Sequence, residues 1–286
     1  MEGLVLAHLG QGIAVEHEDG IALCQPLRRL DTVAVGDKVL WEQVAQGQGR
    51  ITEILPRRSL LARPARGEKI RPVAANIDTV FVVFAVEPDC DFLLVDQYLA
   101  VCKHRNINAA LVFNKSDLPS CERIEQELET YQNLGYALYR VSANTATGLD
   151  ELKQVLNGQV GLLAGQSGVG KSSLTNALIP DKDLKTTAIG ATSKLGKHTT
   201  TAATLYHVPT GGDLIDSPGV AIFGLANFTE QDLANGYKEF QPFIHDCQFN
   251  DCRHIADKGC AVRAAAESGK ISMNRYQRFL KLREKM

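Results

Sequence analysis

Gly165-Gln166-Ser167-Gly168-Val169-Gly170-Lys171-Ser172, followed by Ser173, is the stretch that decides the fold. It fits the pattern G-x-x-x-x-G-K-[ST] and lies between an apolar run that predicts a strand and a segment that predicts a helix. Its glycines let successive backbone N–H groups curl around phosphate oxygens, and the start of the helix adds a favourable dipole. We expect Lys171 to reach the β- and γ-phosphates of a nucleotide, and Ser172 to place its hydroxyl on Mg²⁺. The stretch therefore predicts a nucleotide-binding α/β domain.

The sequence around this loop alternates between apolar segments and helical segments. Buried strands are predicted for residues 80–86, 109–113, 137–141 and 160–164. Helices are predicted for residues 91–104, 120–134 and 150–156. This alternation favours a parallel sheet with crossover helices.

A second motif, Asn114-Lys115-Ser116-Asp117, ends one of these strands, where a ligand-contacting loop belongs in an open α/β sheet. The Asp117 carboxylate can accept hydrogen bonds from N1 and the exocyclic N2 of guanine. Adenine cannot offer that pair of donors and would leave the carboxylate unpaired, so the motif selects GTP or GDP over ATP. We expect Asn114 to tie this loop to the phosphate loop and the Lys115 stem to pack on the base. Ser142-Ala143, after the next strand, is a candidate backbone donor to the guanine O6.

Asp216-Ser217-Pro218-Gly219 follows a further apolar run and has the pattern of a switch loop. We expect the Asp216 carboxylate to hold Mg²⁺ through water and the Gly219 N–H to contact the γ-phosphate. The polar segment before it ends in His198-Thr199-Thr200-Thr201. A threonine here would complete the Mg²⁺ shell only when the γ-phosphate is present, with Thr200 favoured and Thr199 as the alternative.

The group that orients the attacking water is not supplied by the residue after the switch glycine. Many GTPases have glutamine there, whereas this chain has Val220, which cannot do so. Either another group positions the water or intrinsic hydrolysis is slow. His198 is the best nearby candidate, and a solvated histidine without a catalytic role is the alternative.

The motifs stand in an unusual order. In an ordinary GTPase the base-reading loop comes last, but here it precedes both the phosphate loop and the switch. The parts of a GTPase domain are therefore predicted to be joined in circularly permuted order.

Three cysteines and a histidine lie close together near the C-terminus: Cys247, Cys252, His254 and Cys260. This set would make a closed tetrahedral Zn²⁺ site, which is structural because no position is left for water. A small irregular domain needs such a staple. His245 is the alternative to His254 as the fourth ligand. The isolated Cys24, Cys90, Cys102 and Cys121 are expected to be buried reduced thiols.

Residues 1–72 lack helical periodicity and show short alternating apolar segments between glycine-containing turns, the pattern of a small antiparallel barrel. Both an OB-type and an SH3-like barrel fit this pattern. We expect three domains: the barrel at 1–72, the permuted nucleotide-binding domain at 73–226, and a metal-binding domain with a final helix at 227–286.

The composition is that of a soluble globular protein, with 44% hydrophobic and 22% charged residues. No secretory signal is visible, and the longest apolar run is too short to span a bilayer, so we expect a cytoplasmic monomer without a membrane partner. The net charge is −2, yet basic side chains outnumber acidic ones over residues 50–71 and 270–286. Two such clusters indicate either localised contact with a polyanion or two solvated faces.

Taken together, the barrel, the permuted motifs, the histidine–threonine switch and the cysteine–histidine cluster resemble the RsgA (YjeQ/EngC) family over essentially the whole chain. The resemblance implies an OB-fold, a permuted GTPase domain and a zinc domain with one structural ion. It implies a GTPase that acts late in maturation of the small ribosomal subunit, is stimulated by that subunit, and binds rRNA through both flanking domains. Other assembly factors are possible partners. His198 falls on the family's proposed catalytic histidine, whereas Lys197 stands where arginine is expected.

Two other functions fit the residues less well. One is an RNA-binding assembly factor in which GTP only sets the conformation, and the other is a permuted GTPase that acts on the large subunit. The barrel and the cysteine cluster argue against the large subunit.

Overall fold

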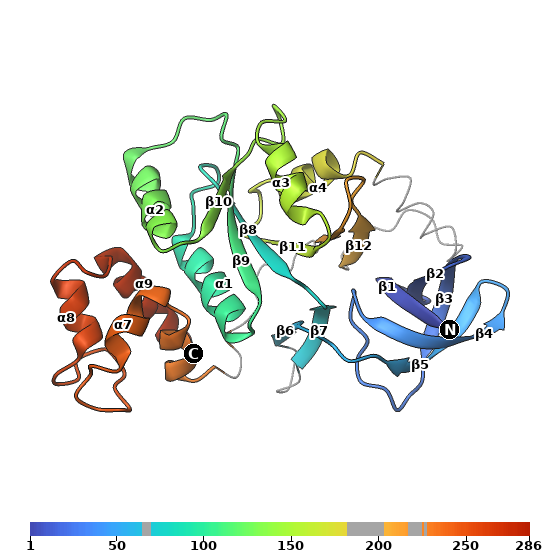
Figure 1. Cartoon of the computed structure of the whole chain (residues 1–286), viewed down its shortest axis with the longest axis horizontal. Helices are drawn as coiled ribbons and strands as arrows, with labels where there is room; N and C mark the ends of the chain where they lie inside the picture. The colour runs from blue at the N-terminus through green and yellow to red at the C-terminus, as the bar shows by residue number, and fades with distance from the viewer. Residues whose placement is uncertain (65–69, 182–202, 217–224, 226–227) are drawn as a thin grey trace.

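The computed structural model describes residues 1–64, 70–181, 203–216, 225 and 228–286. Three parts follow one another across the molecule: an N-terminal barrel, a central sheet with helices, and a helical C-terminal part (Figure 1). Among the helices of the described residues, none is both long enough and apolar enough to span a membrane.

The N-terminal part is a closed barrel of the OB-like form, so the choice that the sequence pattern left open is settled. Its strands run in the order β1-β2-β3-β5-β4, and β1 pairs with β4 to close it. They are β1 (Glu2–Leu9), β2 (Gly12–His17), β3 (Gly20–Pro26), β4 (Lys38–Ala45) and β5 (Gln48–Ile54). Alternate side chains point inward, as in β5, where Gly49 and Ile51 are buried between exposed or half-buried neighbours. Trp41 and Val5 fill the same core.

A two-stranded hairpin, β6 (Leu60–Pro64) and β7 (Ile70–Ala75), connects the barrel to the central sheet. Leu61 and Ala74 are buried in the core of the central part. Ala74 also forms a bridge with Val35 of the barrel, so the hairpin contacts both parts.

The central sheet confirms the predicted α/β architecture. Its strands lie in the order β10-β9-β8-β11-β13-β12, and all of the pairs are parallel except β12 with β13. The strands are β8 (Thr79–Ala85), β9 (Asn108–Asn114), β10 (Ala137–Arg140), β11 (Val160–Ala164), β12 (Thr204–His207) and β13 (Asp213–Asp216). The helices are α1 (Phe92–His104), α2 (Glu122–Asn133), α3 (Leu149–Leu156) and α4 (Lys171–Leu178). Every residue of β8 is buried, as expected for a strand covered on both faces.

The barrel continues this sheet. β1 pairs with β12 at Ala7 and Thr204, which makes one sheet of 11 strands. Beside this pairing, His207 of β12 lies between two carboxylates, 2.8 Å from Glu16 of β2 and 2.6 Å from Asp213 of β13. These contacts raise the pKa of His207 to about 10, so it is a cation at neutral pH. A charged bridge therefore joins the barrel to the central sheet.

The C-terminal part consists of short helices around one small core. They are α6 (Glu230–Asn235), the 3₁₀ helix η1 (Lys238–Phe240), α7 (Gln241–Ile244), α8 (Ala261–Glu267) and α9 (Met273–Arg283). The predicted final helix is confirmed as α9. Phe240, Val262, Phe279 and Leu282 lie in its core.

A cluster of buried charges fixes α9 to the central part. Arg275 is 1% exposed and binds Asp96 of α1 and Glu239 of η1. Arg278 lies 2.6 Å from Asp96 and 2.8 Å from Glu127 of α2. Arg275 is therefore buried, and Arg278 is 11% exposed and engaged by two carboxylates, so neither is free to bind a polyanion; the interleaved Tyr276 and Phe279 are buried as well. Lys270, Lys281 and Lys285 of the same segment are exposed.

Candidate nucleotide site and metal centre

Residues of the three predicted nucleotide motifs lie at one edge of the central sheet, with Asp216 as the described residue of the third. Asn114 ends β9, Gly165 follows β11 and Asp216 ends β13. These strands are parallel, so their carboxyl ends lie together, which is where ligands bind in open α/β sheets.

Asn114 holds the loops of this edge together. Its side chain is buried; Nδ2 donates to the Val169 carbonyl at 2.9 Å, and Oδ1 accepts from the Ala143 N–H at 3.2 Å. The predicted tie between the base-reading loop and the phosphate loop is confirmed. The same amide also fixes the loop that begins at Ser142.

Asp117 lies in an environment that favours its ionised form. A hydrogen bond from Ser142 holds the pKa of its carboxyl below the ordinary value, with further contributions from Asn144 and the charge of Lys115. An ionised, exposed carboxylate is the acceptor that two adjacent guanine donors require. Asn144 is a site residue that the sequence reasoning missed, although it directly follows Ser142-Ala143.

The phosphate loop has the shape that its glycines predict. Gly165 has φ +147°, and a Cβ there would lie 2.0 Å from the Val83 carbonyl oxygen. Gly170 has φ +91°, and a Cβ there would lie 2.3 Å from Asn114 Nδ2. Val169 packs in the core, whereas Ser167, Gly168, Ser172 and Ser173 are exposed. The loop is therefore fixed to the core through Val169, while Gly168 and the serines are open to a ligand, as phosphate binding requires.

Lys171 and Asp216 are two charged groups beside the cradle. The Lys171 ammonium donates to the carbonyls of Gly165 and Gln166 at 2.8 Å and 2.7 Å. Burial lowers the pKa of Lys171, and the charge of Asp216 partly opposes this. This arrangement fits a nucleotide phosphate chain with Mg²⁺, because it combines a cation beside a glycine loop, the start of a helix and a buried carboxylate.

Residues after β8 lie against the base-reading loop and the phosphate loop, an arrangement that the sequence reasoning missed. Lys115 has φ +59°, and its ammonium donates to the Glu87 carbonyl at 2.7 Å rather than lying free. The position of this segment at a strand end was the available signal. The predicted switch residues His198, Thr199, Thr200 and Gly219 lie outside the described residues and remain predictions.

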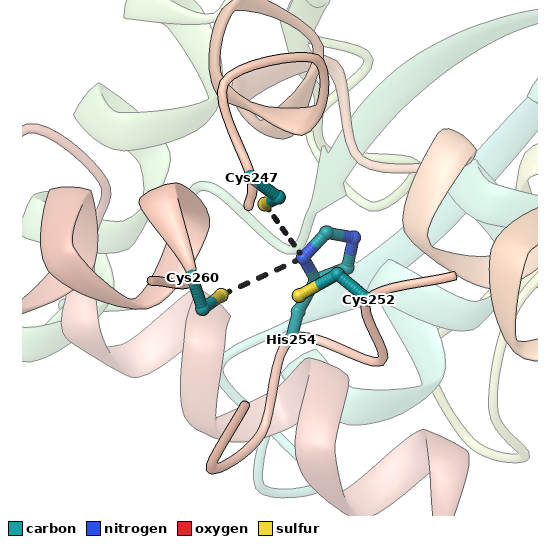
Figure 2. Close-up of side chains that lie close together, drawn as sticks. All are labelled: Cys247, Cys252, His254 and Cys260. Carbon is teal, nitrogen blue, oxygen red and sulfur yellow. Dashed lines mark hydrogen bonds between the residues drawn. The ribbon is translucent and has the colours of Figure 1, made fainter. Parts of the chain in front are cut away.

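The four metal-ligand candidates come together as predicted. The ligand atoms of Cys247, Cys252, His254 and Cys260 all lie within 4.8 Å of one another (Figure 2). His254 Nδ1 is 3.6 Å from the sulfur of Cys247 and 3.7 Å from that of Cys260. His245, the alternative ligand, does not belong to the group.

The surroundings of the cluster suit a metal with sulfur and nitrogen ligands. Burial lowers the pKa of His254, which favours the neutral imidazole that metal coordination requires. The Tyr276 hydroxyl donates to the His254 carbonyl at 2.8 Å and fixes its backbone. Three thiols and one imidazole are a Zn²⁺ donor set. Of the isolated cysteines, Cys24, Cys90 and Cys102 are buried as expected, but Cys121, at the N-cap position of α2, is exposed, and that part of the expectation is wrong.

Comparison with known proteins agrees with this geometry. The RsgA GTPase family matches residues 54–226 of the sequence. The small ribosomal subunit biogenesis GTPase RsgA of Hahella chejuensis is 42% identical over 293 residues, covering 100% of this chain and 84% of the relative. The chain belongs to the RsgA GTPase family. The protein of the same name from Proteus mirabilis is 39% identical, again over 100% of this chain and 84% of the relative.

Two solved structures extend the family likeness to the whole fold. YjeQ from Thermotoga maritima is 32% identical with a TM-score of 0.78, covering 99% of this chain and 97% of that one. YloQ, described as a circularly permuted GTPase, is 26% identical with a TM-score of 0.76, covering 99% of this chain and 94% of that one. Membership of the RsgA family makes this chain a GTP hydrolase and confirms the permuted order inferred from its motifs.

Proposed function

We propose that this GTPase acts in late maturation of the small ribosomal subunit, that the subunit stimulates its GTP hydrolysis, and that both flanking parts bind rRNA. The observation that carries the proposal is the meeting of the base-reading, phosphate and Mg²⁺ motifs at one sheet edge. Relatives that match the full length of the chain are named as small-subunit biogenesis GTPases.

Each described residue of the site has a definite task in this proposal. Asp117 accepts the two guanine donors, while Asn114 holds the base-reading loop against the phosphate loop. Lys171 exchanges its two carbonyl partners for phosphate oxygens when nucleotide binds. Ser172 and Asp216 would hold Mg²⁺, which would supply positive charge beside the phosphates.

The hydrolytic step needs a group that orients water. Val220 has no polar atom for this, so His198 is the proposed catalytic residue, with Thr200 or Thr199 completing the Mg²⁺ shell. Slow hydrolysis in the isolated protein and acceleration by the subunit follow if His198 reaches the nucleotide only in the complex.

One structural Zn²⁺ is proposed at Cys247, Cys252, His254 and Cys260. The C-terminal core is small, so a bound ion that links three separate turns contributes directly to its stability.

Among the described residues, both proposed rRNA contacts offer exposed cations. On the barrel side, the side chains of Arg50 and Arg58 are 51% and 66% exposed. The C-terminal part offers Lys270, Lys281 and Lys285. Two weak polyanion contacts on one molecule strengthen each other through effective concentration.

The test is GTP hydrolysis by the purified protein, with ATP as the nucleotide control and with small or large ribosomal subunits added separately. We expect a slow GTP-specific rate that rises many-fold with small subunits alone. Lys171→Ala should abolish it, whereas Lys153→Ala, which removes only the contact of Lys153 with Asp150 on α3, should not. A hydrolysis rate that does not change when small subunits are added would refute the proposed stimulation. If His198→Ala lost GTP hydrolysis but still supported normal maturation of the small subunit, the proposed role of hydrolysis would be refuted.

A further inference from the structure

Gln166, the second residue of the phosphate loop, directs its side chain away from the nucleotide cradle. Its Nε2 donates to the Asp89 carbonyl at 3.0 Å, and its Oε1 accepts from the Asp91 N–H at 3.0 Å. Both ends of the amide are thus engaged by the backbone of the segment after β8. Glycine or alanine at this position would still satisfy the phosphate-loop pattern, so the pattern does not explain a glutamine here.

The segment that Gln166 holds touches both ligand loops. The Glu87 carbonyl accepts from Lys115 of the base-reading loop at 2.7 Å. Pro88 lies over the phosphate loop, so closely that a Cβ on Gly168 would be 3.3 Å from its ring. Gln166 completes a triangle of contacts between the two loops and this segment.

Asp91, at the end of the segment, is also the N-cap residue of α1. Its carboxylate accepts from the Leu94 N–H at 3.1 Å, so the start of α1 and the partner of Gln166 are the same residue. Further along α1, Asp96 receives Arg275 and Arg278 from α9. On the same helix, Ala100 packs so closely on Gly236 that a Cβ there would lie 2.6 Å away. α1 is therefore the helix on which the C-terminal part is docked.

We propose that Gln166 is a positioning residue for nucleotide binding. It fixes the phosphate loop to the start of α1 and thereby makes nucleotide affinity depend on how the C-terminal part is seated on that helix. This rests on the proposed nucleotide site. The competing view is a surface hydrogen bond without influence on the ligand, which is common for exposed side chains.

Gln166→Met tests the first half because it keeps the length of the side chain and removes both hydrogen bonds. Dissociation constants for GDP and a non-hydrolysable GTP analogue should rise about fivefold, the effect of one net hydrogen bond. KM should rise by a similar factor while kcat changes less than about twofold, since the loop is held alike in the ground and transition states. The melting temperature should stay constant. Gln154→Met on exposed α3 is the matched control.

A double-mutant cycle with Arg278→Lys tests the second half, because lysine keeps the charge but loses the fork that holds Asp96 and Glu127. In the wild-type background it should weaken nucleotide binding about twofold, and in Gln166→Met it should add little. If Arg278→Lys does not fold, His104→Gln serves, since it removes the contact between α1 and Asp232 of α6 at 3.3 Å.

Unchanged affinity in Gln166→Met would overturn the positioning role, and so would a loss of affinity that merely follows a lower melting temperature. Additive effects in the cycle would overturn the link to the C-terminal part. Failure of the wild-type protein to bind guanine nucleotide would instead refute the proposed function itself.

Discussion

Replacing Arg275 with methionine should destabilise the protein by about 3 kcal/mol, near the lower end of the range for breaking a buried ion pair. Methionine keeps an apolar side chain of similar length between the rings of Tyr131 and Tyr237, which lie 5.0 Å and 4.8 Å from the guanidinium carbon. Packing is thus largely retained, and the loss is electrostatic.

The magnitude follows from what each carboxylate keeps. Asp96 retains Arg278 at 2.6 Å and the Tyr131 hydroxyl, so its charge remains compensated. Glu239, whose side chain is 6% exposed, loses Arg275, the partner that binds both of its oxygens. Burial alone would lower the pKa of Arg275, but Asp96 and Glu239 raise it well above its usual value, so the native pair is fully charged.

Urea unfolding followed by circular dichroism measures the change, and thermal unfolding should show a fall of roughly 6–12 °C for a chain of this size. Adding Glu239→Gln should recover part of the loss, because it removes the uncompensated charge. Asp150→Asn breaks an ion pair whose carboxylate is 93% exposed and should leave stability unchanged. A loss below about 1 kcal/mol in Arg275→Met would refute the reasoning, because it would mean that water compensates the charge of Glu239 as well as Arg275 does.

Three further predictions concern the other sites. The raised pKa of His207 implies a contribution to stability that is complete below pH 6.5 and disappears as pH rises to about 10. His207→Gln should therefore flatten the dependence of the melting temperature on pH over that range. An unchanged dependence would contradict the bridge to Glu16 and Asp213. One equivalent of Zn²⁺ should raise the melting temperature of metal-stripped protein, and Cys252→Ser should abolish this response while Cys121→Ser keeps it. Asp117→Asn should reduce affinity for GTP at least about tenfold and favour XTP in a competition assay, because asparagine offers one donor and one acceptor where xanthine has the complementary pair.

The central sheet and its motifs could be predicted from the sequence because their signals are local. Buried parallel strands are continuous apolar runs, and the phosphate loop needs glycine at positions such as Gly165, where a side chain would strike the neighbouring strand. The cysteine–histidine cluster could also be predicted from the sequence, because its ligands lie within a stretch of 14 residues from Cys247 to Cys260.

What could not be predicted depends on contacts between distant segments. Arg275 and Arg278 look like surface cations in the sequence because their carboxylate partners lie 179 and 182 residues away on α1. The pairing of β1 with β12 could not be predicted either, because β12 has only four residues and no sequence pattern that identifies its partner strand. The side-chain contacts of Gln166 with Asp89 and Asp91 could not be predicted either, because the phosphate-loop pattern leaves this position open to any residue.

The strand order also bears on how the chain folds while it is being synthesised. β8 emerges before the other strands of the central sheet; β9 and β10 then extend one side of it, and β11 extends the other. β12 can pair with the barrel strand β1, which is already made, and β13 enters last between β11 and β12. Each strand meets an open edge, so no pair has to separate during growth. The strand that ends in Asp216 therefore links β11 of the central sheet to β12, which pairs with β1 of the barrel.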